Sequence, residues 1–295
     1  MTRLFALLGI LGISFSAIFV KQADVSPSTA AFFRTAYAVP VLFLLWMLVR
    51  RRDRRSVGLR WMAGTAGLFL ALDLAVWHRS IDLIGAGLAT VLANTQVVFV
   101  GLAAWVIYRE RPTGLAFVTI PIVFGGVVLI SGLGRADAFG EDPIAGAALG
   151  VVAGLAYTGF LLVFRASNRE LAPTAGPLLN ATIGAAIGSL LLGAADPDFS
   201  FAFTWPDHGW LLALALVSQV GGWLLIAAAL PRLPALETSV MLLLQPMATV
   251  LWGFLIFAEH LSAAQWAGVA LVLCGVGALT LRGSVERPAG APAEA

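Results

Sequence analysis

The residues best suited to chemistry are polar and aromatic side chains inside segments that are otherwise apolar. Asp73 and Trp77 are four positions apart, and Gln219 and Trp223 repeat that spacing. Side chains four apart on a helix share one face. A polar group within a long apolar segment is costly unless it faces the protein interior or a water-filled cavity. Each pair therefore predicts a helix face that lines an internal binding site.

Two glutamines extend this predicted site. Asn94 and Gln96 are two positions apart and so lie on different faces of a continuous helix. We favour Gln96, because Gln245 stands 149 residues later and is followed by Pro246. A proline frees a backbone carbonyl one turn earlier, and that carbonyl can line a wet site. Gln96 and Gln245 are therefore expected to face the same cavity.

The sequence thus predicts a pocket with aromatic walls and a few polar groups. Stacking on aromatic rings gives affinity and polar groups give orientation, a mixture that suits a zwitterion with an apolar side chain. No residue is expected to be catalytic, and no cofactor or metal is expected. The chain has no GxxxxGK(S/T) phosphate-binding loop, so the sequence does not support ATP hydrolysis. The predicted substrate-binding residues are Phe15, Phe19, Asp73, Trp77, His78, Gln96, Phe99, Tyr157, Gln219, Trp223, Gln245 and Trp252.

Several of these residues have a second interpretation. Trp77 is near the expected outer end of its helix, where aromatic residues form an interfacial belt. Phe99 and Trp252 could pack in the core. Gln96 and Gln245 could bond neighbouring helices. The sequence leaves these alternatives open.

The charged residues raise the question of coupling to protons. Asp73 and His78 are the candidates, because a buried Asp and a His can titrate near neutral pH. They are five positions apart, a poor spacing for one helix face, and His78 beside Arg79 fits the water interface. Arg34 is expected to snorkel outward from the second apolar segment. Proton-coupled movement and movement down the solute's own gradient both stay open.

The composition requires lipid as the surrounding solvent. Of 295 residues, 60% are hydrophobic and 12% are charged, and the mean hydropathy is +0.92. Soluble domains have about 45–50% apolar and about 25% charged residues. The net charge of +2 comes without an aromatic and basic stripe, which excludes nucleic acid as a partner. The single cysteine, Cys274, cannot form an internal disulfide.

Ten segments are long enough to cross a bilayer as helices, each of which needs about 20 apolar residues. Helices are required because lipid cannot satisfy backbone polar groups, and barrel strands would alternate in polarity. The first segment could be a signal peptide, but it has a counterpart later in the chain. The predicted spans are 4–20, 28–49, 61–80, 85–107, 114–133, 144–164, 175–194, 209–230, 236–257 and 264–281.

The basic residues predict the orientation of these spans. Of the 18 Lys and Arg residues, Lys21, Arg79 and Arg135 fall on one side of the membrane, Arg34 lies within a span, and all others fall on the opposite side. Cytoplasmic loops carry the excess of Lys and Arg. Both termini are therefore expected in the cytoplasm, for a multi-pass protein of the bacterial inner membrane.

The chain also repeats itself. At a shift of 149 residues Gln96 meets Gln245 and Glu110 meets Glu259, so 1–134 and 143–283 are interpreted as two five-helix repeats. Residues 284–295, rich in Pro and Ala, are expected to be a disordered tail. Because five is odd, the second repeat enters from the opposite side, and such inverted repeats are typical of secondary transporters. The predicted fold is an all-α integral membrane protein of ten transmembrane helices in two inverted repeats.

Two stretches give the chain a resemblance to the EamA-type branch of the drug/metabolite transporter superfamily. They are Tyr108-Arg109-Glu110-Arg111-Pro112 and Phe257-Ala258-Glu259-His260-Leu261, and the segment 71–80 resembles bacterial aromatic amino-acid exporters. The resemblance covers about residues 1–283. It implies export by alternating access and a central cavity lined by spans one, three, four, six, eight and nine. It also implies packing or dimer roles for spans five and ten.

We therefore expect a secondary transporter, acting as a monomer or homodimer in the bilayer, that exports small metabolites, foremost aromatic or hydrophobic amino acids. A carrier for another neutral or anionic metabolite or drug is the alternative. Polyanions would need several intramembrane cations, and Arg34 is alone. A membrane-embedded enzyme would need a facing set of His and carboxylates, and a channel a ring-like selectivity element, and neither pattern is found.

Overall fold

The computed structural model describes residues 2–108, 114–133, 136–168, 173–229 and 235–285. Within these ranges all regular structure is helical, which confirms the all-α prediction. A 3-10 turn, η1 (Arg50–Arg52), follows α3, and a π-helical segment, η2 (Leu214–Gly222), joins α9 to α10. The helices are α1 (Thr2–Ser14), α2 (Ser16–Gln22), α3 (Pro27–Val49), α4 (Val57–Ala93), α5 (Gln96–Tyr108), α6 (Gly114–Ile130), α7 (Pro143–Ser167), α8 (Ala175–Gly193), α9 (Asp207–Ala213), α10 (Trp223–Ala229), α11 (Ala235–Phe257) and α12 (Ala263–Val285).

The helices are long and apolar enough for a multi-pass membrane protein. In the described ranges six stretches qualify as spans by length and composition, and three shorter apolar helices accompany them. One stretch, Val57–Ala103, has 47 residues. At about 1.5 Å per residue it would extend roughly 70 Å, about twice the thickness of a hydrocarbon core. A single crossing cannot hold it.

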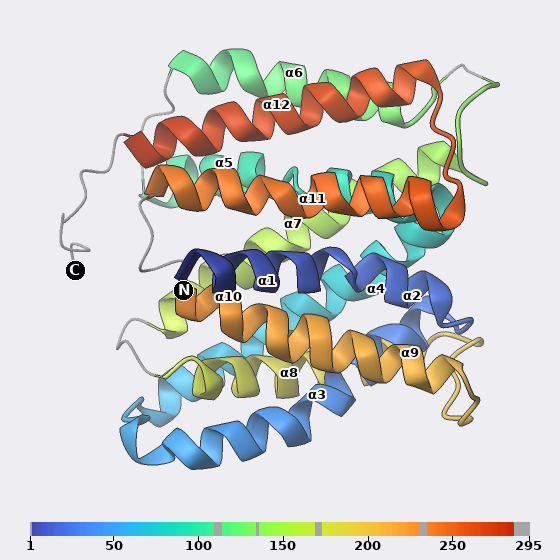
Figure 1. Cartoon of the computed structure of the whole chain (residues 1–295). Helices are drawn as coiled ribbons and strands as arrows, with labels where there is room; N and C mark the ends of the chain where they lie inside the picture. Colours follow the sequence, from blue (N-terminus) through green and yellow to red (C-terminus); the bar gives the residue numbers. More distant parts are fainter. Residues whose placement is uncertain (1, 109–113, 134–135, 169–172, 230–234, 286–295) are drawn as a thin grey trace.

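Gly85 divides this stretch into two. Its φ of 81° is a left-handed conformation that glycine adopts without strain. Figure 1 shows the chain reaching one end of the bundle along α4 and returning along α5. The predicted spans 61–80 and 85–107 therefore correspond to the parts of the stretch before and after Gly85.

Polar residues at the helix starts explain several boundaries. Ser26 accepts a hydrogen bond from the Thr29 amide at 3.3 Å, and Pro27 is the first residue of α3. Asp142 accepts from the Ala145 amide at 3.0 Å, one residue before the first proline of α7. Such caps satisfy amides that the first helical turn leaves free. The Ser-Pro and Asp-Pro pairs thus set where these spans begin.

Helices α6 and α12 pack side by side at one edge of the bundle, and α3 and α8 lie at the opposite edge (Figure 1). Helix α1 lies between α10 and α11 and contacts both. The start of α1 and the end of α12 are at the same end of the bundle. Of the predicted tail 284–295, the first two residues belong to α12, and 286–295 lie outside the described residues.

Glycines allow two helix pairs to approach backbone to backbone. A Cβ atom at Gly67 of α4 would collide with the backbone of α8, and one at Gly184 of α8 would collide with the backbone of α4 at Gly64. In the other pair, a Cβ at Gly126 of α6 would lie 2.8 Å from the carbonyl oxygen of Gly268 in α12. Small residues permit such close packing within membranes. Both pairs therefore depend on the absence of a side chain at these positions.

Large apolar side chains cover the outside of the bundle. Leu48 is 83% exposed, Val106 75% and Phe117 64%. Soluble monomers rarely expose contiguous apolar surface on this scale. The exposure has a simple physical reason if the surrounding medium is the hydrocarbon core of a bilayer.

The charged loop between α3 and α4 contains a buried ion pair. Asp53 and Arg55 are joined by two hydrogen bonds of 2.9 and 3.0 Å. Trp46 donates to Asp53 at 2.9 Å, and Arg55 donates to Asn180 of α8 at 2.9 Å. The hydrogen bonds from Arg55 lower the pKa of the Asp53 carboxyl to about 2. The loop is thereby fastened to α3 and to α8.

Candidate functional site

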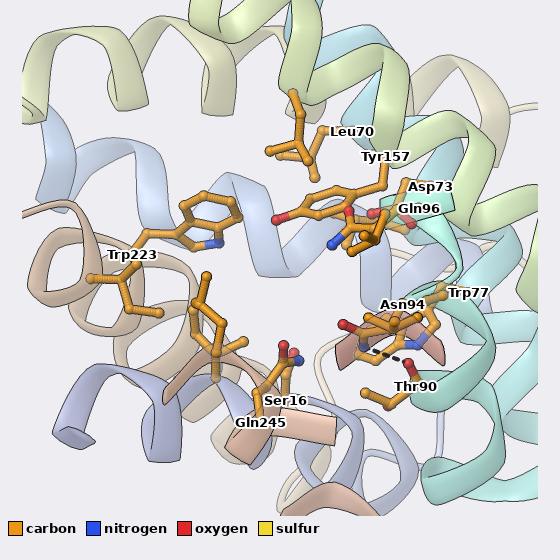
Figure 2. A pocket seen from close by; sticks show the side chains of 18 of the residues that line it. Ser16, Leu70, Asp73, Trp77, Thr90, Asn94, Gln96, Tyr157, Trp223 and Gln245 are labelled. Carbon is orange, nitrogen blue, oxygen red and sulfur yellow. Dashed lines mark hydrogen bonds between the residues drawn. The ribbon is translucent and has the colours of Figure 1, made fainter. Parts of the chain in front are cut away.

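A cavity of about 330 Å³ lies inside the bundle (Figure 2). Its walls come from α1, α2, α3, α4, α5, α7, α10, α11 and α12. Spans two and ten, which the resemblance did not place at the cavity, contribute Arg34 and Val276. The lining residues are Ile13, Ser16, Arg34, Leu70, Asp73, Leu74, Trp77, Thr90, Ala93, Asn94, Gln96, Val97, Tyr157, Leu161, Trp223, Ile226, Leu242, Gln245 and Val276.

Half of the predicted site residues meet at this cavity. In Figure 2, Asp73 and Gln96 lie close together on one side, and the Trp223 indole lies on the opposite side. The ring of Tyr157 lies between them, with its centroid 6.3 Å from that of Trp223. One side of the cavity therefore carries polar groups together with Trp77, and Trp223 lies across from them. The predicted residues that line it are Asp73, Trp77, Gln96, Tyr157, Trp223 and Gln245.

The two glutamines at equivalent positions both line the cavity. Gln96 begins α5, and Gln245 precedes Pro246 within α11. Leu242, which is also part of the lining, lies about one turn before the proline. Thr249 donates a hydrogen bond of 3.0 Å to the backbone oxygen of Gln245. This side-chain hydrogen bond lies next to Pro246, which has no backbone N–H to donate to the carbonyl of Leu242.

Four predicted aromatic residues lie outside the lining. Phe15 stacks on Trp252 with ring centroids 4.9 Å apart, and Phe19 lies 6.0 Å from Phe15. The Trp252 indole donates to the Ser14 hydroxyl at 3.1 Å. The ring of Phe99 lies 6.4 Å from that of Phe124 on α6, measured between centroids. These rings join helices to one another rather than lining the cavity.

His78 and Gln219 are buried but do not line the cavity either. Both are 0% exposed, and His78 Nδ1 lies 3.1 Å from the Pro27 carbonyl oxygen. The expectation that His78 meets water at the interface is therefore wrong, because α3 covers it. Gln219 is in the π-helical segment η2 and reaches the cavity indirectly, through a hydrogen bond to Arg34.

Arg34 lies at the cavity, and the expectation that it snorkels outward is wrong. Its side chain is buried, and its Nε donates to Gln219 Oε1 at 3.0 Å. One terminal nitrogen, Nη1, donates to the Ser16 hydroxyl at 3.0 Å. The guanidinium lies 5.9 Å from the centre of the Trp77 ring. The hydrogen bonds that Arg34 donates to α2 and η2 and its cation–π contact compensate for its removal from water.

The expectation that Asn94 and Gln96 lie on different faces is also wrong, since both line the cavity. Helix α4 ends at Ala93 and α5 begins at Gln96, so the helical spacing does not apply between them. Asn94 Nδ2 donates to the Thr90 carbonyl at 2.8 Å, the dashed line in Figure 2. The break turns both polar side chains toward the same space.

A buried carboxylate fastens the bundle beyond the cavity. Glu259, which follows α11, is 2% exposed and forms an ion pair with Lys21 of α2 at 2.9 Å. It also accepts hydrogen bonds from the amides of Ala86 at 2.8 Å and Gly87 at 3.2 Å. These amides follow Gly85, where a new helical segment begins and its amides are free to bind an anion. The counterpart Glu110 lies outside the described residues.

Residues that could ligate a metal do not cluster in the described part of the chain. Within those ranges no group of three or more His, Cys, Asp or Glu side chains could hold a metal ion. The residues that line the cavity offer hydrogen-bonding groups, opposite charges and aromatic surface.

Comparison with known proteins gives a consistent picture. The model of the EamA-like transporter family matches residues 1–132 and 144–281. An uncharacterized transporter of Archaeoglobus fulgidus is 28% identical over 271 residues, 90% of this chain and 92% of that protein. The uncharacterized transporter YwfM of Bacillus subtilis is 24% identical over 215 residues, 72% of this chain and 70% of that protein.

A solved crystal structure has a similar fold. It superimposes with a TM-score of 0.62 over 97% of this chain and 98% of that chain, at 17% sequence identity. At this identity the likeness concerns the fold alone.

Proposed function

Because this chain belongs to the EamA-like transporter family, we propose that it exports small metabolites, with aromatic or other hydrophobic amino acids as substrates. The chain is a multi-pass membrane transporter of the drug/metabolite type. The proposal for the substrate depends on one observation. A single internal cavity brings Asp73, Gln96 and Gln245 together with Tyr157 and Trp223.

The size of the cavity favours a small solute. Pockets for small molecules have volumes of about 300–1,000 Å³. At about 330 Å³ this cavity is near the lower limit, so a single amino acid fits it better than a large drug. A nucleotide sugar or another polyanion would need several cations. Among the described lining residues, Arg34 alone carries a positive charge, and Asp73 carries a negative charge.

We propose ten spans in two inverted repeats, 1–134 and 143–283, with both termini in the cytoplasm of a bacterium. The family match divides at nearly the same place, and a helix is present at each expected span. The start of α1 and the end of α12 at one end of the bundle support an even number of crossings (Figure 1). Alternating access then requires the two repeats to exchange conformations around the cavity.

The proposal is tested by reconstituting the purified protein into liposomes and measuring uptake of labelled phenylalanine, leucine, lysine and glutamate. Faster entry of phenylalanine and leucine than into empty vesicles is expected, with little entry of the two charged amino acids. Equal rates with and without protein for every solute would contradict the proposal. Uptake of charged amino acids alone would retain a transporter and reject the substrate class.

A further inference from the structure

We propose that Arg34 and Asp73 form a split charge site, in which Arg34 binds the carboxylate of a zwitterionic solute and Asp73 binds its ammonium group. The inference rests on the proposed function in taking the cavity as the place where the solute binds. It adds the residues that determine which charged groups the solute must carry.

Arg34 keeps a hydrogen-bonding nitrogen available at the cavity. Two of its three nitrogens bind Gln219 and Ser16, each at 3.0 Å. Within the described residues the second terminal nitrogen, Nη2, has no hydrogen-bond partner. Arg34 is 5% exposed and lines the cavity. A guanidinium fixed on one side and free on the other is suited to bind a carboxylate.

Asp73 supplies a negative charge that no described residue of the protein pairs with. It is 8% exposed, lines the same cavity and, among the described residues, has no hydrogen-bond partner for either carboxylate oxygen. No ion pair joins it to Arg34 in the described part of the chain, although both border one small space. In Figure 2 Asp73 is seen on the same side of the cavity as Gln96.

The separation of the two charges is physically informative. Opposite charges in a low-dielectric interior normally pair directly, because each is costly alone. Here Ser16 and Gln219 hold the guanidinium from other elements. The charges of Arg34 and Asp73 cancel, so the pair adds no net charge to the cavity. Arg34 still offers a positively charged hydrogen-bond donor, and Asp73 offers a negatively charged acceptor. A zwitterion satisfies both, whereas an acid leaves Asp73 unpaired and an amine leaves Arg34 unpaired.

The side of the cavity that carries Trp223 specifies the remainder of the solute. Trp223 lies across the cavity from Asp73 (Figure 2), and Leu161 and Ile226 are also part of the lining. A solute whose charges are bound by Arg34 and Asp73 can direct an apolar side chain toward Trp223. The predicted ligand class is an amino acid with an apolar or aromatic side chain and both charged groups unmodified.

The test compares three ligands that share a phenyl group. Binding of phenylalanine, 3-phenylpropionate and phenethylamine to the full-length protein in detergent is measured by calorimetry. Phenylalanine is expected to bind at least about tenfold more tightly than the other two, since each of those leaves a buried charge unpaired. Comparable affinity of all three for the wild-type protein would overturn the split charge site.

Two single variants then test each charge. In Asp73→Asn the preference for phenylalanine over 3-phenylpropionate is expected to disappear, and in Arg34→Gln the preference over phenethylamine. If Arg34 and Asp73 served folding alone, each substitution would weaken the binding of all three ligands to the same degree. That result would overturn the proposal. If Arg34→Gln does not give folded protein, Asp73→Asn decides by itself, because its selectivity must still shift toward the anion.

The outcome is separable from the proposed function. Selective binding with the expected shifts, but no flux in liposomes, would retain the split charge site and reject transport of amino acids. Flux of phenylalanine with unchanged selectivity in both variants would reject the split charge site and retain the proposed function. Absence of binding by phenylalanine would count against the site.

Discussion

Lys21 Nζ lies 2.9 Å from Glu259 Oε1, although 238 residues separate them in the sequence. The same carboxylate accepts hydrogen bonds from the amides of Ala86 and Gly87. One side chain therefore connects the end of α2, the segment that follows Gly85, and the end of α11. This contact explains why a glutamate follows a long apolar helix.

Replacing Glu259 is expected to destabilise the bundle. Glu259→Ala leaves two backbone amides and Lys21 without their anion, and the loss of one partner of a buried ion pair costs about 3–5 kcal/mol. Glu259→Gln keeps an acceptor oxygen and should cost less. The melting temperature of the purified protein in detergent measures both. His260→Ala, at the exposed neighbouring position, is the control, and equal melting temperatures for all three variants would contradict the role of the carboxylate.

Gly85 is expected to tolerate no side chain. A Cβ atom there would lie 2.6 Å from the Glu259 carboxylate, and φ is 81°. Backbone with this φ and a ψ of 168° is essentially restricted to glycine and costs a residue with a side chain about 1–3 kcal/mol, and the collision adds to this cost. Gly85→Ala should therefore lower the melting temperature more than Gly101→Ala, where a Cβ meets nothing within 4 Å. The reverse order would show that the turn is not constrained as described.

Asp53 is expected to make stability depend on pH in the acidic range. Its folded-state pKa of about 2 is below the usual 3.8, so the carboxylate stabilises the fold above about pH 4. That contribution, about 2 kcal/mol for a shift of this size, is lost as the pH falls through 2. At pH 7 the melting temperature of Asp53→Asn should be lower than that of the wild type. At pH 3 this difference in melting temperature should be smaller. Asp198→Asn, at an exposed aspartate, should show no such difference, and a difference that widens in acid would contradict the sign.

Lining residues are expected to affect transport without affecting the fold. Trp223→Ala, Gln96→Ala and Gln245→Ala should each slow uptake of phenylalanine by about tenfold or more, since each removes a group that orients the solute. Trp61→Ala is the matched control, because this tryptophan is 74% exposed. Uptake rates per folded transporter decide the outcome. Normal rates in all three lining variants would show that the solute binds elsewhere.

The sequence predicts the all-helical fold of the described residues because lipid imposes a length and a composition on each spanning segment. Ser26 with Pro27 and Asp142 with Pro143 are local patterns of the same kind, and each pair stands at the start of a helix. Helices and their starts depend on short stretches of chain, which is why pattern and spacing suffice for them. Gln96 and Gln245, at equivalent positions of the predicted repeats, both line the cavity, and their role in binding stays a prediction.

Other parts of the site depend on contacts between distant segments. Arg34 stays at the cavity because Gln219, 185 residues away, holds its guanidinium, and nothing near Arg34 in the sequence indicates this. Its charge inside an apolar segment was the available signal, because such a residue is a candidate for a functional site, but the only expectation for Arg34 was that it snorkels outward. The helix break after Ala93 likewise changes the direction in which the Asn94 side chain points. The two residues between the helices are Asn94 and Thr95, so no proline or glycine in the sequence indicates the break.

The backbone contact at Gly67 and Gly184 has a consequence for the two charged residues of the cavity. Helix α8 packs on α4, which carries Asp73, and also on α3, which carries Arg34. A side chain added at either glycine would push α8 away from α4 and weaken the support that the two helices share. A substitution that never touches the solute would thereby disturb the spacing of the two charges.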